Sequence, residues 1–308
     1  IGSHIAMKLN HKAIIIDNCS NSKLDYKRYL PFCKVYKKNL DFQSLDKIFA
    51  SHKITNVIHL AGSKSVNDSI SNPLEYYENN VSSTINLLKV MQKYNTKRLV
   101  FSSSATVYGI YNKSPLKENM KLKAINPYGR TKIFIEKIID DFVLSSKNFK
   151  AISLRYFNPI GSTRKNILPE QPLGNPQNIM PVLINSIIND QEFNIYGKNY
   201  ATKDGTCIRD YLHVDDLAEA HIKSLKSFKK ISGHEKINIG TGKGYSVLDL
   251  INTFEKINKV KIKFKFTKRR AGDAAISYAS NQKAKRFLNW YPKFGLKDMC
   301  MDSWQSTQ

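Results

Sequence analysis

Short apolar runs alternate with amphipathic segments through the first half of the chain. Apolar runs bounded by small or polar residues predict β-strands at 12–17, 57–62, 98–105 and 151–159. Among the segments between them, residues 80–94 place Val81, Ile85, Leu88 and Met91 on one helical face. Strands that are apolar throughout and separated by helices are typical of a parallel sheet covered on both faces. The pattern therefore predicts an α/β fold with a doubly wound, Rossmann-type parallel sheet.

The amino-acid composition of the chain changes near residue 158. Residues 158–178 are rich in Pro, Asn and Gly, which predicts a long loop. Loops of this length in compact domains usually carry function. We expect a first domain of residues 1–157 and a smaller α/β domain of residues 158–308, partly interleaved with the first.

The formal net charge of +24 raises the question of nucleic-acid binding. Lysines are scattered along the chain together with acidic residues, so the charge is better explained by a lysine-rich composition than by a nucleic-acid interface. In the densest basic stretch, 260–270, lysines alternate with Ile262, Phe264 and Phe266. This alternation predicts a half-buried strand with a solvated lysine face.

Targeting and metal-binding patterns are not evident. No apolar run approaches the roughly 18–20 residues that span a bilayer, and the start of the chain has no secretory signal. The four cysteines lie far apart and the histidines lack a metal-ligand spacing. We therefore expect no metal and a reduced, cytoplasmic protein. His213 and His221, which flank a predicted helical segment, are interpreted as structural.

The stretch NPYGRTK, 126–132, predicts the start of a helix that carries candidate catalytic side chains. Asn126 can cap a helix whose first residue is Pro127. Tyr128 and Lys132 then lie four residues apart on one face. A phenol titrates near ~10 and is a poor base at neutral pH, but a nearby ammonium favours its ionised form. On spacing alone, chance is the better explanation for such a pair.

Three further features favour a functional role for Tyr128 and Lys132 over chance. Ser104 lies in SSSATVYG, directly after a predicted strand, where open α/β sheets bind ligands. Gly2 lies where a phosphate could approach a helix N-terminus. Asp17 closes a predicted strand, where a carboxylate can hold an adenosine ribose. Each could arise by chance, whereas the ordered set is much harder to dismiss.

Motifs along nearly the whole chain resemble the extended short-chain dehydrogenase/reductase family, and within it the UDP-glucose (UDP-galactose) 4-epimerases. The motifs are IGSH, DNCSNS, HLAGSKSV, PLEYYENNV, FSSSATVYG, NPYGRTK, LRYFNPIG, NIMP, DGTCIRDYLHVDDLA, NIGTGKGYSV and RRAGD. So many motifs in order make the resemblance specific.

The resemblance implies three catalytic roles. Tyr128 would remove the proton of the sugar 4-hydroxyl, and Ser104 would bridge the substrate and the tyrosine. Lys132 would hold the nicotinamide ribose and lower the pKa of Tyr128. Hydride would pass from C4 to bound NAD and return to the other face of the 4-keto sugar. UDP-galactose and UDP-glucose would thereby interconvert without net oxidation.

The resemblance also implies binding residues and partners. The cofactor positions, besides the catalytic three, are Ile1, Gly2, Asp17, Asn18, Asn21, Ser22, Asn39, Leu40, Leu60, Ala61, Gly62, Lys64, Asn79 and Phe157. The substrate positions are Lys64, Ser104, Asn158, Asn178, Ile195, Tyr196, Arg209, Arg270, Asp273 and Ser277. Arginines suit a diphosphate because a guanidinium offers paired donors. We expect a UDP-sugar as partner, neither nucleic acid nor membrane, and a homodimer formed through helices near 80–94 and 128–143.

The start of the chain departs from the family, which opens with a strand and a GxxGxxG loop. Gly2 is the only glycine of that loop in this sequence. The family's first strand is central in the sheet, so two strand edges would lose a partner, at roughly a few kcal/mol for each buried unpaired group. The chain also begins with Ile1 rather than Met. These features favour a fragment of a longer enzyme; a product that holds NAD poorly is the alternative.

Other positions bear on the reaction and on the substrate. Ala105 and Thr106 follow Ser104, so the carboxyl acid–base groups of the family's dehydratases are missing. Asn39 replaces an aspartate near the adenine and can still accept a hydrogen bond. Ser277 is small where a tyrosine would restrict the pocket, so UDP-N-acetylated hexoses are expected as substrates too.

Two alternatives to a 4-epimerase stay open. One is another nucleotide-sugar enzyme of the family, such as a 4-reductase or a uronate epimerase. The other is a catalytically impaired or non-catalytic protein that binds sugar nucleotides.

Overall fold

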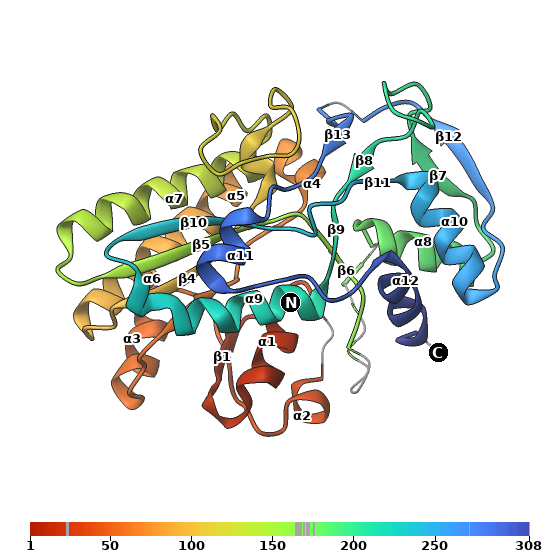
Figure 1. Ribbon diagram of the computed structural model, residues 1–308. Coiled ribbons are helices and arrows are strands. Elements are labelled where there is room, and N and C mark those ends of the chain that lie inside the picture. The colour runs from red at the N-terminus through yellow and green to blue at the C-terminus, as the bar shows by residue number, and fades with distance from the viewer. Residues whose placement is uncertain are drawn as a thin grey trace.

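The computed structural model describes residues 1–22, 25–163, 168, 170, 173–174, 176–270 and 272–307 (Figure 1). The strands are β1 (Ile14–Asp17), β2 (Lys34–Lys37), β3 (Val57–His59), β4 (Arg98–Ser104), β5 (Lys150–Tyr156), β6 (Asn158–Ile160), β7 (Phe193–Tyr196), β8 (Ile208–Arg209), β9 (Tyr211–His213), β10 (His234–Ile239), β11 (Tyr245–Ser246), β12 (Phe264–Thr267) and β13 (Ile276–Ser277). The helices are α1 (Gly2–Leu9), α2 (Tyr26–Tyr29), α3 (Phe42–Ser51), α4 (Val66–Ser71), α5 (Pro73–Tyr77), α6 (Ser83–Lys93), α7 (Pro127–Ser145), α8 (Ile179–Ile188), α9 (Val214–Ser227), α10 (Val247–Asn258), α11 (Gln282–Leu288) and α12 (Leu296–Gln305). Shorter turns are η1 (Asn10–Lys12), η2 (Glu78–Ser82), η3 (Ala105–Tyr108) and η4 (Phe228–Lys230).

The main sheet is parallel and has the order β10-β5-β4-β3. Its central strands β4 and β5 pair from Arg98 with Lys150 to Ser104 with Tyr156. The strands expected at 57–62 and 98–105 are confirmed as β3 and β4. The strand expected at 151–159 is wrong as a single element. After Phe157 the chain leaves the main sheet, and β6 pairs with β9 instead.

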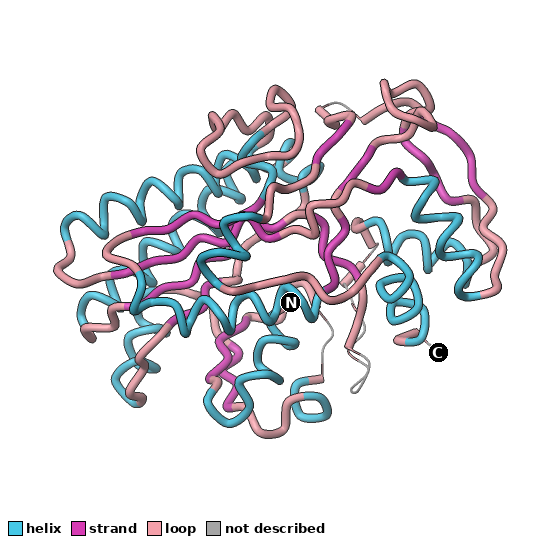
Figure 2. Tube along the Cα trace, viewed as in Figure 1, coloured by secondary structure: helices cyan, strands magenta, loops and turns pink. Residues whose placement is uncertain are grey.

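Helices cover both faces of this sheet (Figure 2). Leu99, Phe101 and Ala151 pack with residues of α3, α6 and α7. Val100, Ile152 and Leu154 belong to a second cluster with residues of α9 and α11. Because successive side chains of a strand point to opposite faces, the two clusters lie on opposite sides. The doubly wound α/β fold is confirmed.

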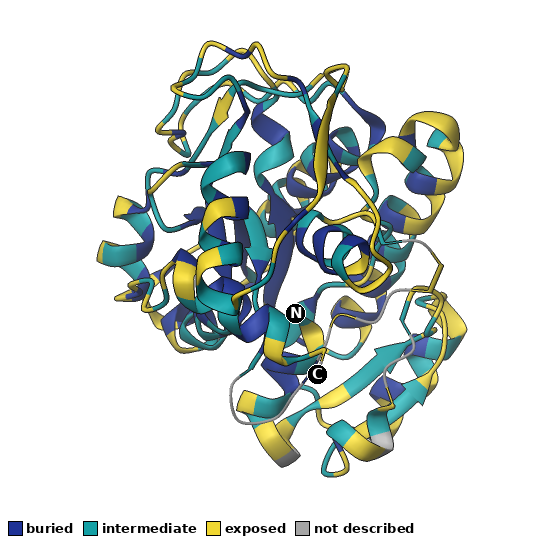
Figure 3. Ribbon diagram, turned by 90° about the vertical axis from the view of Figure 1, so that its right-hand side faces the viewer, coloured by how far each residue is buried: buried dark blue, intermediate teal, exposed yellow. Residues whose placement is uncertain are grey.

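The β1–β2 pair forms a separate parallel sheet rather than extending the main one. Within the described ranges, β1 pairs only with β2, and β3 pairs only with β4. Ile14 is 37% exposed and the rest of β1 is half-buried, whereas the inner part of β4 is buried, as the dark blue strands of Figure 3 illustrate. One edge of β1 and one edge of β3 thus lack a neighbouring strand among the described residues, as expected.

The second half of the chain builds smaller sheets around its own core. β8 pairs antiparallel with β11 and parallel with β13, and β7 pairs with β12. α8, α10 and α12 pack around these strands in one apolar cluster. β10 returns to the main sheet beside β5. The loop expected at 158–178 is interrupted from its start by β6, and part of it lies outside the described residues.

The basic stretch near 260–270 forms β12, as expected, but its side chains are arranged differently. Phe264 and Phe266 are 38% and 43% exposed, while Ile262 is buried. Lys263 and Lys265 pair with Asp190 and Glu192, near β7. The half-buried apolar face is therefore a wrong expectation for the two phenylalanines: β12 pairs only with β7 among the described strands. No helix in the described residues combines the length and apolarity needed to cross a membrane.

Candidate active site

The helix start at Asn126 has the expected geometry. The Asn126 side chain accepts a hydrogen bond from the backbone N–H of Gly129 at 2.7 Å, and Pro127 occupies the first turn. This cap fixes where α7 begins. Tyr128 lies in the first turn of α7 and Lys132 one turn later, so both are placed by the same rigid helix.

The end of β4 brings Ser104 to these two residues. Lys132 is 5% exposed, and its Nζ donates to the carbonyl oxygen of Ser102 at 2.9 Å. Ser104 Oγ accepts from Thr106 Oγ1 at 3.0 Å, and the same serine lies near enough to Tyr128 to lower the pKa of the phenol. The three residues expected to be catalytic are thus brought together at the carboxyl end of the sheet, where open α/β sheets bind their ligands.

The protonation of this group differs from the sequence expectation. Burial raises the pKa of Tyr128 well above its ordinary value, although Ser104 works in the opposite direction. Burial also lowers the pKa of Lys132 to about 8, an effect that the Glu136 carboxylate opposes. Lys132 Nζ lies 5.7 Å from the centre of the Tyr128 ring. At this separation, desolvation outweighs the attraction expected from Lys132, so the expected lowering of the Tyr128 pKa is not found in this structure.

The loop after β3 is fastened to α7 by a buried asparagine that the sequence did not single out. Asn80 is 1% exposed, accepts from the N–H of Ser63 at 2.7 Å, and donates to Thr131 at 3.2 Å. Gly62, at φ +150°, belongs here because a Cβ would lie 2.9 Å from Asn80 Oδ1. Asn79 donates to the Ser63 hydroxyl at 2.8 Å. The loop of Leu60, Ala61 and Gly62 is therefore held beside Lys132's helix.

The residues expected at the adenosine end of NAD cluster after β1. Asp17 closes β1 and accepts from Tyr26 at 2.8 Å, and Asn18 donates to Asn39 at 2.9 Å. The remaining expected members follow in nearby loops; they are Asn21, Ser22 and Leu40. A carboxylate and two amides at a strand end supply the acceptors and donors that a ribose and an adenine require. This donor set fits the cofactor.

The start of α1 fits the NAD cofactor less well than the residues after β1 do. Gly2 begins α1, and a Cβ there would only touch Leu60 at 3.5 Å. Glu170 accepts from Lys64 at 3.0 Å and from Asn178 at 2.7 Å. This carboxylate links two expected ligand-binding residues and gave no recognisable signal in the sequence.

The second half of the chain contributes a cluster of basic and acidic side chains. Arg209 on β8 pairs with Asp273 at 3.3 Å and lies opposite Ser277 of β13. Arg270 lies over the ring of Tyr196, 3.7 Å from its centre. Ile195 precedes Tyr196 on β7; its side chain is buried, whereas that of Tyr196 is half-buried.

Contacts join this cluster to the catalytic end of β4. The Gly272 backbone lies against Ile125, directly before the cap of α7, since a Cβ on Gly272 would meet Ile125 at 2.4 Å. Phe157 packs with Ala279, and the N–H of Asn158 donates to the carbonyl of Asp210 at 3.0 Å. The expected cofactor and substrate residues therefore border the same region.

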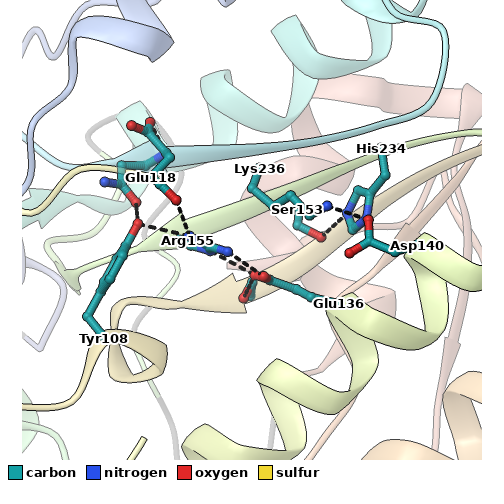
Figure 4. A network of polar contacts seen from close by, with 10 residues as sticks. Tyr108, Glu118, Glu136, Asp140, Ser153, Arg155, His234 and Lys236 are labelled. Carbon is teal, nitrogen blue, oxygen red and sulfur yellow. Dashed lines mark hydrogen bonds and ion pairs between the residues drawn. The ribbon is translucent and has the colours of Figure 1, made fainter. Parts of the chain in front are cut away.

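Sequence reasoning missed two buried, paired residues. Glu136 lies one turn beyond Lys132 on α7, and Arg155 lies on β5 (Figure 4). Glu136 also accepts from Ser103, and Arg155 donates to Tyr108. Glu136 continues the four-residue spacing of Tyr128 and Lys132, which is the signal that could have identified it.

Comparisons with known proteins agree with this geometry. The model of the NAD dependent epimerase/dehydratase family matches residues 1–240. The UDP-glucose 4-epimerase of Bacillus subtilis is 40% identical over 317 residues, covering 99% of this chain and 93% of that protein. The crystal structure of UDP-glucose 4-epimerase from Bifidobacterium longum in complex with NAD+ and UDP has a TM-score of 0.93 and 38% identity, covering 99% of this chain and 95% of the other. The enzyme from Stenotrophomonas maltophila, with bound NAD and formylated UDP-arabinopyranose, has a TM-score of 0.93 and 35% identity, covering 99% and 94%. The chain belongs to the NAD dependent epimerase/dehydratase family.

Proposed function

We propose that this protein interconverts UDP-glucose and UDP-galactose by transient oxidation at C4 of the hexose, with NAD as a bound cofactor. The observation that carries the proposal is the meeting of Ser104, Tyr128 and Lys132 at the carboxyl end of β4. A base, a hydroxyl bridge and a buried cation suit the removal of a proton from a sugar hydroxyl.

Tyr128 is the group that takes this proton and later returns it. Ser104 lies near the phenol and favours its ionised form. Because burial raises the pKa of Tyr128, ionisation requires positive charge nearby, and Lys132 supplies it from the same helix face. NAD, when bound beside these residues, would supply reversible hydride transfer at C4 of the hexose.

We propose that residues 1–157 bind NAD and that residues 158–308 bind the nucleotide sugar. Asp17, Asn18 and Asn39 hold the adenosine end, and Gly62, Lys64 and Asn79 border the middle of the cofactor. The remaining assigned cofactor positions are Ile1, Gly2, Asn21, Ser22, Leu40, Leu60, Ala61 and Phe157.

Arg209 and Arg270 bind the diphosphate of the UDP-sugar, because paired guanidinium donors match phosphate oxygens. Asp273 orients Arg209 through their ion pair. The remaining assigned substrate positions are Asn158, Asn178, Ile195, Tyr196 and Ser277. Ser277 leaves room for an N-acetyl group, so UDP-N-acetylglucosamine is a second substrate.

Two properties complete the proposal. The protein acts as a homodimer through the surface around α7, supported by exposed Phe134, which stacks on Tyr77, and by exposed Ile70 and Leu74 on neighbouring helices. It works in the cytoplasm, which the free thiols of its cysteines support.

The test is conversion of UDP-galactose to UDP-glucose by the protein supplied with NAD, measured by product analysis and NADH absorbance together. We expect conversion without net NADH, and a loss of about 10²–10⁴-fold in kcat for Tyr128→Phe. Net NADH accumulation would instead identify a dehydrogenase. Undiminished conversion by the variant would remove Tyr128 from the mechanism.

A further inference from the structure

A row of polar side chains crosses the main sheet just behind the catalytic serine. Ser103 on β4, Arg155 on β5 and Asn238 on β10 are register partners, so they lie side by side on one face. They are each at most 3% exposed. The same face is covered by α7 (Figure 4). Polar groups buried this deeply between a helix and a sheet require partners, and the partner here comes from α7.

Glu136 is that partner. Its two carboxylate oxygens accept from Arg155 Nε at 2.9 Å and from Arg155 Nη2 at 2.6 Å. The Ser103 hydroxyl donates to Glu136 at 2.6 Å. A bidentate guanidinium–carboxylate pair fixes both distance and orientation, unlike a single flexible contact. The pair therefore sets the height and the rotation of α7 on the sheet.

The remaining donors of Arg155 are also used. Nη1 donates to the Tyr108 hydroxyl at 3.1 Å and to the carbonyl of Glu118 at 3.2 Å. The Tyr108 hydroxyl donates in turn to Asn238 at 2.6 Å. Arg155 is thus held from both sides, so Glu136 binds a rigid partner.

The catalytic residues share this helix face. Tyr128, Lys132 and Glu136 follow one another at four-residue spacing, about 6 Å apart along the helix axis. Ser103, which Glu136 binds, directly precedes Ser104. Any slip or rotation of α7 at Glu136 would consequently change the distances among Ser104, Tyr128 and Lys132.

We propose that the Glu136–Arg155 pair is a positioning device that aligns Tyr128 and Lys132 on α7 with Ser104 on β4. The proposal rests on the proposed function, since it concerns the same site. Glu136 touches neither the substrate nor the cofactor in this role; it acts through the helix and through Lys132. It also supplies the negative charge that opposes the effect of burial on Lys132.

The chain offers a matched control on the same helix. Asp140 lies one turn beyond Glu136 and binds His234 at 2.8 Å and Lys236. It too joins α7 to the sheet through a carboxylate, but it is farther from Lys132. The titratable groups near Lys132 are Tyr128 and Glu136 on α7 and His59 on β3. Tyr156 on β5 and Tyr76 on α5 act on Tyr128.

The experiment compares Glu136→Gln with Asp140→Asn in the NAD-supplied protein. We expect Glu136→Gln to lower kcat about tenfold with little change in KM for UDP-galactose, because misaligned groups slow the reaction without weakening binding. We also expect the alkaline limb of its pH–kcat profile to move to lower pH, since the lysine loses a neighbouring negative charge. Asp140→Asn should keep the wild-type kcat and profile.

A second measurement does not depend on turnover. An NMR titration of Lys132 in the NAD-free protein with isotope-labelled lysine reports the pKa of this buried lysine, and Glu136→Gln should lower it while Asp140→Asn should not. If Glu136→Gln fails to fold, Glu136→Gln combined with Arg155→Met removes both buried charges and restores folding; its kcat should remain about tenfold low. A folded variant with wild-type kcat and an unshifted lysine pKa overturns the proposal. Absence of turnover in the wild type, with the lysine shift present, counts instead against the proposed function.

Discussion

The carbonyl oxygen of Ser102 accepts a hydrogen bond from Lys132 Nζ at 2.9 Å, so the end of β4 holds an ammonium in a buried position. Burial lowers the pKa of that ammonium to about 8. Its charge is therefore present at neutral pH and is lost as the pH rises through about 8. The structure thus ties a catalytic charge to a titration close to physiological pH.

We expect epimerisation to decline on the alkaline side, as Lys132 loses its proton and no longer favours ionised Tyr128. The measurement is kcat between about pH 6 and 10, at saturating UDP-galactose. Lys132→Met should be slow throughout and lack this limb. If kcat of the wild type stays constant through pH 9, the ionisation of Lys132 does not control kcat.

Asn80 and Asn79 are neighbours with different expected effects. Asn80→Ala should lower the free energy of unfolding by about 2–3 kcal/mol, because the Ser63 backbone groups and Thr131 lose a buried partner. Asn79→Ala, at an exposed side chain, should change it by less than about 0.5 kcal/mol but weaken NAD binding. Urea denaturation and NAD titration measure the two effects; equal destabilisation by both changes would contradict the assignment.

Ser277 offers a test of substrate range. Ser277→Tyr should reduce turnover of UDP-N-acetylglucosamine by at least tenfold, since the larger side chain fills the space beside Arg209, and should largely spare UDP-glucose. Parallel kcat/KM measurements on both sugars decide this. As a control, Tyr278→Phe changes the adjacent residue without filling that space. No turnover of the acetylated sugar by the wild type would reject the broader range.

The sequence was sufficient for the parts of the fold that depend on local signals. The cap at Asn126, the stripe of Tyr128 and Lys132, and strands β3 and β4 follow from spacing and periodicity. The domain boundary was expected at this point, but the break between β5 and β6 after Phe157 was missed, because the partners of the two strands lie far away in sequence. The same reason applies to the exposure of Phe264 and Phe266.

In the site, too, residues in local motifs could be predicted, whereas residues that depend on distant partners could not. Motif residues identified Ser104, Tyr128 and Lys132, but Asn80 and Arg155 act through partners on other elements. The pKa of Tyr128 depends on how deeply the phenol is buried, and no spacing rule contains that quantity.

The exposed side chains of β12 affect how the protein behaves in concentrated salt. On this strand the exposed Phe264 and Phe266 alternate with Lys263 and Lys265, whose charges are partly balanced by Asp190 and Glu192. Charged lysines discourage edge-to-edge association of strands from different molecules. Concentrated salt weakens that repulsion, so precipitation of this protein in high-salt buffers should begin at this edge.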